Sequence, residues 1–346
     1  MHKNILILTP FYPPNIGGAE SFTEGLVKEA SQCSNITVLT YMPMGSVPSG
    51  KEQSFTYPSG SLNVLRLNGF SRPTKTWQGL NMSRAFLVFL HLFLASARLN
   101  LRREKFQIIH AQGLISGLIA VLLKKAFKVK AFVTLLALYE FDKKGWLFNT
   151  MAGGIFRNCD IIFVEGKNGQ KDIKRFNVGS KVRIFQHWVD SNHYRPPQSR
   201  DSTRTRILFV GRPIKEKGRH ILEGAERILS DRSKYEFIYV ENVPYKYLPG
   251  YYQMAHVVAV PSLYAEGFAR VVAEAASCGC AVITSDNGSL PEMVREFGYV
   301  SSIENFTENL KKVADNWKQF SERSIEYANA NFRSNNAEVF IREYRV

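Results

Sequence analysis

The sequence predicts an α/β protein with two Rossmann-like domains, each built around a parallel sheet. At 346 residues the chain is longer than one ordinary hydrophobic core requires and has the length of two domains. Short β-rich runs alternate with helix-length segments, which is typical of doubly wound sheets. The polar, proline-containing stretch 187–206 divides these runs into two series, and we expect it to be an interdomain linker.

The runs of the first series are predicted to be strands. Each is short and rich in Ile, Val, Leu or Thr, and helix-length or loop-like segments separate them. They occupy residues 4–9, 35–41, 62–68, 108–112, 130–136, 160–165 and 181–186. A first domain over residues 1–186 is therefore expected.

The second series has the same character and predicts a second domain over residues 187–329. Its strands are expected at residues 206–211, 235–241, 257–262, 281–286 and 298–302. The chain then ends in a long helical stretch. We expect its last part, about residues 330–346, to pack back on the first domain.

Composition and cysteine usage indicate a globular protein of a reducing compartment. Hydrophobic residues are 45% and charged residues 22%, which excludes a disordered chain. Cys278 and Cys280 have no second cluster, so small buried residues are favoured over metal ligands. The longest apolar run, Ala85–Ala97, falls short of the roughly 20 residues that span a bilayer. We expect neither a signal peptide nor a transmembrane helix, and a cytoplasmic location.

Positive charge is concentrated in the first half of the chain. Residues 1–190 hold 24 Lys and Arg against 11 Asp and Glu, whereas residues 191–346 hold 21 against 19. Basic side chains crowd residues 98–130, beside the apolar stretches 85–97 and 113–123. They are Arg98, Arg102, Arg103, Lys105, Lys124, Lys125, Lys128 and Lys130, against the single acid Glu104.

Bases beside apolar helices are typical of proteins that bind an anionic membrane surface. The alternative is a set of ordinary solvated lysines at helix ends. Nucleic acid is not expected as a partner, because no aromatic residues are interleaved with the bases and no binding motif is present. We therefore expect peripheral attachment to the inner face of the cell membrane.

Two loops that follow predicted strands carry groups suited to a phosphorylated ligand. Gly17 and Gly18 follow the first strand and precede a helix, so backbone N–H groups there can approach a ligand. Gly211, Arg212 and Lys217 follow the first strand of the second series, and two cations at such a turn suit a diphosphate. Each loop has a plainer explanation, a tight turn or a charged surface loop.

A third loop carries two acids eight positions apart. If residues 267–279 form a helix, Gly267, Phe268 and Ala269 offer free N–H groups at its positive end. Glu266 would lie in the loop just before it and Glu274 two turns inside. Carboxylates repel phosphate, so they suit neutral hydroxyls or a developing cation. The plainer alternative is one glutamate near the helix dipole and one solvated glutamate.

These residues resemble the GT-B glycosyltransferases of family four, the retaining group known as glycosyl transferases group 1. The resemblance covers nearly the whole chain. It depends on GGAE (17–20), FVGR with KEKG (209–218), YKYLPGYYQMAHVVAVPS (245–262), EGFARVVAEAASCGCAVITS (266–285) and GSLPEMV (288–294). It implies a GT-B fold, in which the two domains face each other across a cleft and the first binds the acceptor.

The resemblance also implies roles for individual residues. Glu266 would contact the donor sugar and Glu274 the ribose, while Arg212 and Lys217 would hold the diphosphate. The nucleotide sugar would also meet Gly17, Gly18, Gly211, Gly267, Phe268, Ala269 and Val271. No metal and no cofactor is expected, because the departing diphosphate assists the acceptor and the two cations balance its charge.

The function implied is transfer of a hexose from a nucleoside-diphosphate sugar to a lipid-linked or polysaccharide acceptor in cell-envelope glycan synthesis. The chain departs from the family at Ala269 and Arg270, which replace Gly and Leu, and at Leu136, which replaces a histidine. Tyr139, Glu140 and Asp142 are the candidates to replace that histidine. Two alternatives stay open: a degenerate protein that binds sugar nucleotide or a partner without turnover, and a sugar-nucleotide epimerase.

Overall fold

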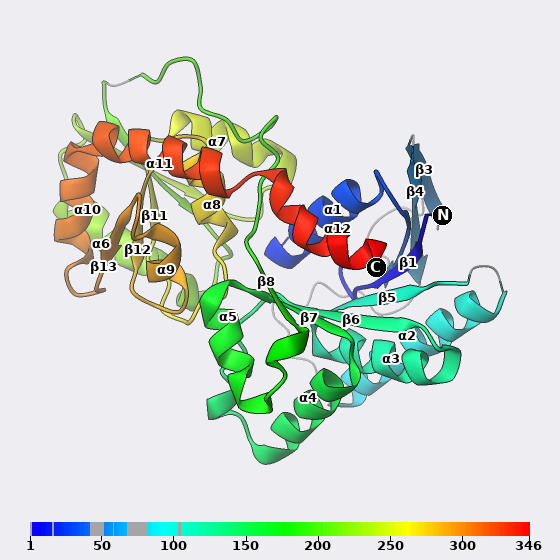
Figure 1. Ribbon diagram of the computed structural model, residues 1–346. Coiled ribbons are helices and arrows are strands. Elements are labelled where there is room, and N and C mark those ends of the chain that lie inside the picture. Colours follow the sequence, from blue (N-terminus) through cyan, green and yellow to red (C-terminus); the bar gives the residue numbers. More distant parts are fainter. Residues whose placement is uncertain are drawn as a thin grey trace. The chain divides into compact units, whose positions relative to one another are not determined.

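The protein folds into two compact units in the computed structural model. The structure describes residues 2–15, 17–41, 52–57, 59–67, 82–102, 105–201 and 203–346, without the side chains of residues 52, 53, 82–85, 101 and 102. The first unit comprises Met1–Phe185 and Ala337–Val346, and the second comprises Gln186–Asn336. Both are α/β units with a largely parallel sheet, as the sequence predicts (Figure 1).

The sheet of the first unit has the strand order β3-β4-β2-β1-β5-β6-β7-β8. Its strands are β1 (Asn4–Leu8), β2 (Asn35–Tyr41), β3 (Glu52–Tyr57), β4 (Gly60–Leu67), β5 (Ile108–Gln112), β6 (Lys130–Leu135), β7 (Ile161–Glu165) and β8 (Val182–Phe185). All neighbours pair in parallel except β3 and β4, which form an antiparallel hairpin at the edge. The predicted strands are present, and β3 is an addition that the sequence pattern did not indicate.

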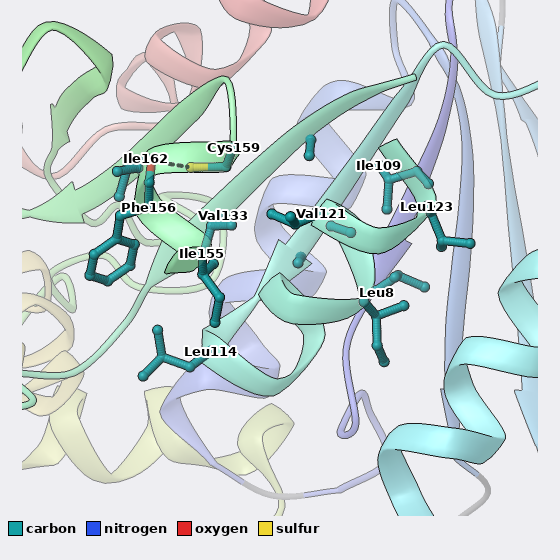
Figure 2. Close-up of a cluster of buried hydrophobic side chains, with 14 of the residues drawn as sticks. Leu8, Ile109, Leu114, Val121, Leu123, Val133, Ile155, Phe156, Cys159 and Ile162 are labelled. Atoms are coloured by element: carbon teal, nitrogen blue, oxygen red, sulfur yellow. Dashed lines mark hydrogen bonds between the residues drawn. The ribbon is translucent and has the colours of Figure 1, made fainter. Parts of the chain in front are cut away.

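Helices cover this sheet on both faces. They are α1 (Gly18–Ala30), α2 (Met82–Arg102), α3 (Gly113–Phe127), α4 (Trp146–Asn158), α5 (Gly166–Ile173) and, from the end of the chain, α12 (Glu338–Arg345). On one face the strands present Leu8, Ile109, Val133 and Ile162 to the apolar sides of α3 and α4 (Figure 2). These near-continuous apolar strands match a parallel sheet buried on both sides.

The C-terminal helix α12 packs on the opposite face through aromatic rings. Phe340 stacks on Phe163 with the ring centroids 4.2 Å apart. His110 of β5 is fully buried beside them, with Nδ1 on the Tyr344 hydroxyl and Nε2 2.6 Å from the Thr134 hydroxyl. Burial lowers the pKa of His110 to about 3, so the ring is neutral at physiological pH.

The second unit has a wholly parallel sheet with the order β10-β9-β11-β12-β13. Its strands are β9 (Thr205–Val210), β10 (Tyr235–Val240), β11 (Val257–Val260), β12 (Ala281–Ser285) and β13 (Tyr299–Ser301). Its helices are α6 (Arg219–Ile228), α7 (Leu248–Met254), α8 (Arg270–Ser277), α9 (Leu290–Val294), α10 (Phe306–Asp315) and α11 (Trp317–Asn331). Every strand predicted for this half is present. The strand order reverses between β9 and β11.

The stretch expected to be an interdomain linker packs within the second unit, which begins at Gln186. Trp188, Val189 and Tyr194 are buried there, and the Val189 N–H donates to the Phe332 carbonyl at 3.1 Å. These apolar side chains are spaced among polar ones, which hid their packing role. The expectation of a linker over residues 187–206 was therefore wrong.

Candidate functional site

Two loops of the second unit meet at the point where its strand order reverses. Parallel strands β9 and β11 are neighbours, so the loops after their carboxyl ends lie side by side, where doubly wound sheets bind ligands. The Leu263 N–H donates to the Glu216 carbonyl at 2.7 Å and ties the loops together. Gly218 has φ +73°, and a Cβ there would lie 1.8 Å from the Pro261 carbonyl oxygen. Only glycine permits this approach.

Glu266 lies at this junction in a closed network of donors. It is 4% exposed, and its Oε1 accepts from Lys217 Nζ at 2.6 Å and from the Ser262 hydroxyl at 2.6 Å. Its Oε2 accepts from the Tyr264 hydroxyl at 2.7 Å. The sequence-predicted cation and acid are thus brought together, whereas Ser262 and Tyr264 were missed although they stand four and two positions before Glu266.

Lys217 is positively charged in this network. Burial acts to lower its pKa, but the Glu266 carboxylate and the Tyr264 hydroxyl outweigh burial, and the pKa is raised. The ammonium also lies 5.1 Å from the centroid of the Tyr264 ring. The junction therefore holds one buried ion pair of no net charge.

The backbone of Glu266 is fixed by the loop before α9. The Ser289 N–H donates to the Glu266 carbonyl at 2.9 Å. Gly288 has φ +61°, and a Cβ there would lie 2.5 Å from both the N and the O of Glu266. This contact accounts for the glycine of the GSLP run, since any side chain would displace the acid.

Arg212 differs from Lys217 in its surroundings. It is exposed directly after β9, and its guanidinium makes no hydrogen bond or ion pair with the described residues. Gly211 beside it lies close to the Phe209 ring, 2.9 Å from where a Cβ would stand. The structure thus leaves Arg212 available to an anionic ligand, while Lys217 is already paired.

Glu274 is buried rather than solvated, so the plainer explanation of the second acid was wrong. Helix α8 begins at Arg270, which places Glu274 one turn inside instead of the two expected. Its side chain is 3% exposed and that of Arg270 is 11% exposed. Glu274 Oε1 accepts from Arg270 Nε at 3.3 Å, and Oε2 accepts from the Tyr252 hydroxyl at 2.8 Å.

Arg270, which the sequence left unexplained, therefore pairs with the second acid. It also donates to the Tyr245 hydroxyl, and its guanidinium lies 5.4 Å from the Tyr245 ring centroid. Burial opposes the charged form, but Tyr245 and Glu274 raise the pKa of Arg270. Burial also disfavours the charged form of Tyr252, and for a tyrosine this raises the pKa well above its usual value. No signal in the sequence indicated that these two tyrosines would surround the pair.

The residues at the N-terminus of α8 pack against the core of the second unit. Ala269 is the N-cap and supplies no side-chain cap, and Val271 packs against the core of the unit with Phe268. The Phe268 ring stacks on His187, with the centroids 4.1 Å apart. Burial, and then the Arg270 charge, lower the pKa of His187 well below its usual value. A neutral imidazole beside the helix start was not expected from the sequence.

In the first unit the glycine pair lies at the start of α1. Gly17 is the N-cap, and Gly18 is the first helical residue. A Cβ at Gly17 would lie 2.2 Å from a carboxylate oxygen of Glu20, so an acid already lies against this helix start. The arrangement suits neutral groups better than a second anion.

The three candidates to replace the missing histidine differ in position. Asp172 of α5 accepts from the N–H groups of Tyr139 (2.7 Å) and Phe141 (3.0 Å) and so fixes their loop. Glu140 pairs with the neighbouring Lys143, and Asp142 pairs with Arg175 at 3.0 Å. Only Tyr139 of the three packs against the core of the unit.

Metal clusters and membrane spans are both absent from the part of the chain that the structure describes. Among those residues, no group of three or more His, Cys, Asp or Glu could hold a metal ion. No described helix combines the length and apolar character needed to cross a bilayer.

Comparison with known proteins matches part of the second unit to a family and the chain to several relatives. Residues 226–331 match the family described as "Glycosyl transferases group 1". Spore coat protein SA of Bacillus subtilis (strain 168) is 27% identical over 214 residues, 48% of this chain and 54% of that protein. An uncharacterized 41.2 kDa protein in the cps region of Klebsiella pneumoniae is 33% identical over 153 residues, 37% of this chain and 42% of its own. The chain thus spans about half the length of these two relatives.

One curated relative matches over most of the chain. It is a subunit of the human enzyme phosphatidylinositol N-acetylglucosaminyltransferase. The two are 24% identical over 350 residues, 89% of this chain and 68% of that protein.

Solved structures extend the likeness to the whole fold. Sucrose-phosphate synthase from Thermosynechococcus elongatus superimposes with a TM-score of 0.78 at 18% identity, over 99% of this chain and 98% of that one. Anabaena HepE in complex with UDP-glucose gives a TM-score of 0.70 at 13% identity, over 99% of both chains. The predicted fold class and the predicted resemblance are confirmed.

Proposed function

Because the chain has the GT-B fold and its residues 226–331 match the group 1 glycosyltransferases, we propose that it transfers a hexose from a nucleoside-diphosphate sugar. The observation that carries the proposal is the Lys217–Glu266 pair at the carboxyl ends of β9 and β11. It supplies a cation and an acid at the position where such sheets bind nucleotides. The HepE structure, which contains UDP-glucose, supports this class of donor.

The two acids keep unused hydrogen-bond acceptor positions that ligand hydroxyls can take. A carboxylate offers about four acceptor positions. Glu266 uses three of them on Lys217, Ser262 and Tyr264, which leaves one for a hydroxyl of the donor sugar. Glu274 uses two, which leaves two for the ribose hydroxyls.

The cations are assigned to the diphosphate. Arg212 can donate two parallel hydrogen bonds, as guanidinium groups do to phosphate. Lys217 has three donors, of which one serves Glu266 and one the Tyr264 hydroxyl, so the third can reach a phosphate oxygen without breaking the pair. Backbone N–H groups of Gly267, Phe268 and Ala269 add neutral donors at the start of α8.

The reaction we propose is retaining and needs no metal. The bond between the sugar carbon and the diphosphate oxygen breaks, and charge on the leaving oxygens is stabilised by Arg212 and Lys217. The departing diphosphate accepts the proton of the acceptor hydroxyl, which attacks from the same face. Glu266 stabilises the positive charge that develops at the sugar carbon.

A lipid-linked or polysaccharide acceptor is proposed from the surface of the first unit. Trp146, Leu147 and Met151 of α4 are exposed, Trp146 to 77%, and Lys143 and Lys144 precede them. Such an apolar tip beside bases is suited to an anionic bilayer. No pattern in the sequence indicated this tip.

A second apolar face of the first unit supports the same proposal. Phe86, Leu87, Leu90 and Leu94 are exposed on α2. The bases Arg98 of α2, Lys105 after it, and Lys125 and Lys128 at the end of α3 are also exposed. Lys124 contributes less, because it pairs with Asp160 at 2.6 Å. Arg103, Glu104 and the side chain of Arg102 lie outside the described residues. We propose that the protein is cytoplasmic and attaches to the inner face of the membrane.

Incubation with radiolabelled UDP-, GDP- and ADP-sugars and a membrane lipid extract tests the function. Label in the lipid or polysaccharide fraction is the expected result. Conversion of the nucleotide sugar itself without acceptor would indicate an epimerase. Binding with no turnover for any donor would indicate the degenerate alternative, which Leu136 and Ala269 favour.

A further inference from the structure

A buried amide in the first unit has no partner. Gln112 is the last residue of β5 and the N-cap of α3, and it is 8% exposed. Neither its Nε2 nor its Oε1 makes a hydrogen bond with the described residues. Burying an unpaired amide is costly, so a position that keeps one calls for an explanation.

The neighbouring histidine on the same sheet face is satisfied, unlike Gln112. Residues two apart in a strand share a face, so Gln112 lies on the same face as His110. Both His110 ring nitrogens have partners, and one of them is the Thr134 hydroxyl. Thr134 is the residue paired with Gln112 across the strands, yet its hydroxyl serves His110. The Thr134 hydroxyl is therefore bonded to His110 and leaves the Gln112 amide without a partner among the described residues.

The amide also lies at the edge of the sheet where ligands of doubly wound sheets bind. The order β4-β2-β1-β5-β6 runs in opposite directions from β1, so the strand order reverses between β1 and β5. Ligands of doubly wound sheets bind beyond the carboxyl ends at such a point. Gln112 is the carboxyl end of β5. Gly113, next in the chain, has φ +79°, and the Tyr139 hydroxyl lies 3.5 Å from where a Cβ would stand.

The groups around this helix start are neutral. The first turn of α3 holds no acidic residue, and the Tyr139 hydroxyl accepts a hydrogen bond from the Leu114 N–H. Burial raises the pKa of Tyr139 to about 12, so its hydroxyl is uncharged at physiological pH. Tyr139 is held in place by Asp172 through its backbone N–H.

We infer that Gln112 is the recognition group of a subsite for a carbohydrate hydroxyl at the carboxyl end of β5. An amide donates through Nε2 and accepts through Oε1, and a hydroxyl group does both in return. A carboxylate or an ammonium would use only one of the two atoms. The inference rests on the proposed function, since the hydroxyl belongs either to the donor sugar or to a sugar of the acceptor.

Gln112→Met tests the inference, because it keeps the length of the side chain and removes both polar atoms. If Gln112 serves a ligand, the ligand-free variant is more stable than the wild type. Loss of an unpaired buried amide should raise the Tm by about 2–4 °C for a unit of this size. Gln170→Met on the exposed face of α5 is the matched control and should leave the Tm unchanged.

Ligand binding is read in the same pair of proteins by NMR. The side-chain amide signals absent from Gln112→Met assign Gln112 in the wild type. Methyl α-D-glucoside, methyl α-D-mannoside and the UDP-, GDP- and ADP-sugars are titrated as probes. At least one should move those signals, and Gln112→Met should bind that probe about tenfold or more weakly, as expected for two lost hydrogen bonds.

The titrations distinguish whether the hydroxyl belongs to the donor sugar or to the acceptor. Weaker binding of a nucleotide sugar with unchanged binding of its nucleoside diphosphate assigns the subsite to the donor. Weaker binding of a methyl glycoside alone assigns it to the acceptor. A lower Tm in Gln112→Met, or amide signals that no probe moves, would overturn the inference. Failure of the wild type to bind any nucleoside diphosphate would instead count against the proposed function.

Discussion

Replacement of Arg270 by leucine removes the cation of a buried ion pair in the second unit. Arg270 Nε and Glu274 Oε1 are 3.3 Å apart, and their side chains are 11% and 3% exposed. At this distance the attraction is about 5 kcal/mol with an effective dielectric constant of 20. Breaking a buried pair on one side costs about 3–5 kcal/mol, because the remaining charge stays buried. We expect Arg270→Leu to lower the free energy of unfolding of the second unit by about that amount.

A second substitution separates the pair from the packing around it. In Arg270→Leu/Glu274→Leu no charge is left unpaired, so most of the lost stability should return. Arg219→Leu is the control, since Arg219 is 41% exposed and its pairs with Glu223 and Glu241 are screened by solvent. Its effect should be much smaller.

Urea unfolding followed by tryptophan fluorescence measures these differences. The chain has four tryptophans, and replacing Trp77 and Trp146 by phenylalanine leaves Trp188 and Trp317, both in the second unit, as reporters. A change below about 1 kcal/mol for Arg270→Leu, the range of exposed pairs, would refute the reasoning. So would a double variant that is no more stable than the single one.

Three further outcomes are expected. His110 has a folded pKa of about 3 against 6.5 unfolded, so the unfolded state binds more protons between these values and stability falls as the pH drops. Urea unfolding at a series of pH values measures this slope. His110→Gln should reduce the pH dependence of the unfolding free energy by about 1.4 kcal/mol per pH unit, whereas His220→Gln, at an exposed position, should leave it unchanged. The same pH dependence in His110→Gln and the wild type would contradict this. Transfer of labelled sugar should continue in excess EDTA, because Arg212 and Lys217 balance the diphosphate charge; activity that returns only with added Mg²⁺ or Mn²⁺ would count against it. In vesicle co-sedimentation, Trp146→Ser should weaken binding to anionic vesicles, which itself should fall with salt; equal binding to neutral vesicles would exclude the electrostatic part.

Much of the fold could be predicted because its strands are buried on both faces. Runs such as Ile161–Glu165 and Val257–Val260 are short and almost wholly apolar, as expected of strands in a parallel sheet, and turns separate them clearly. Strand β3, Glu52–Tyr57, was missed because it is polar and pairs only with β4 in the edge hairpin. The residues 187–206 were misread because their buried aromatics are too widely spaced to form a pattern.

The candidate site could be predicted in its residue types but not in its contacts. The spacing of Glu266 and Glu274 around a helix start indicated two acids near one strand end; Glu266 lies in the loop after β11 and Glu274 one turn inside α8. Their burial could not be read from the sequence, since it depends on tyrosines from other segments, Tyr245 and Tyr252. Arg270 replaces the leucine expected from the resemblance, and its contacts with Glu274 and Tyr245 explain it.

Calorimetry with Glu266→Gln and Glu274→Ala tests the central claim, that one acid serves the donor sugar and the other the ribose. Glu274→Ala should weaken binding of the free nucleoside diphosphate by about 1.5–3 kcal/mol, the range for hydrogen bonds to a charged group. Glu266→Gln should leave that binding unchanged and lower the turnover number about a hundredfold, as loss of one electrostatic stabiliser does. Equal weakening of nucleoside-diphosphate binding by the two substitutions would contradict the account.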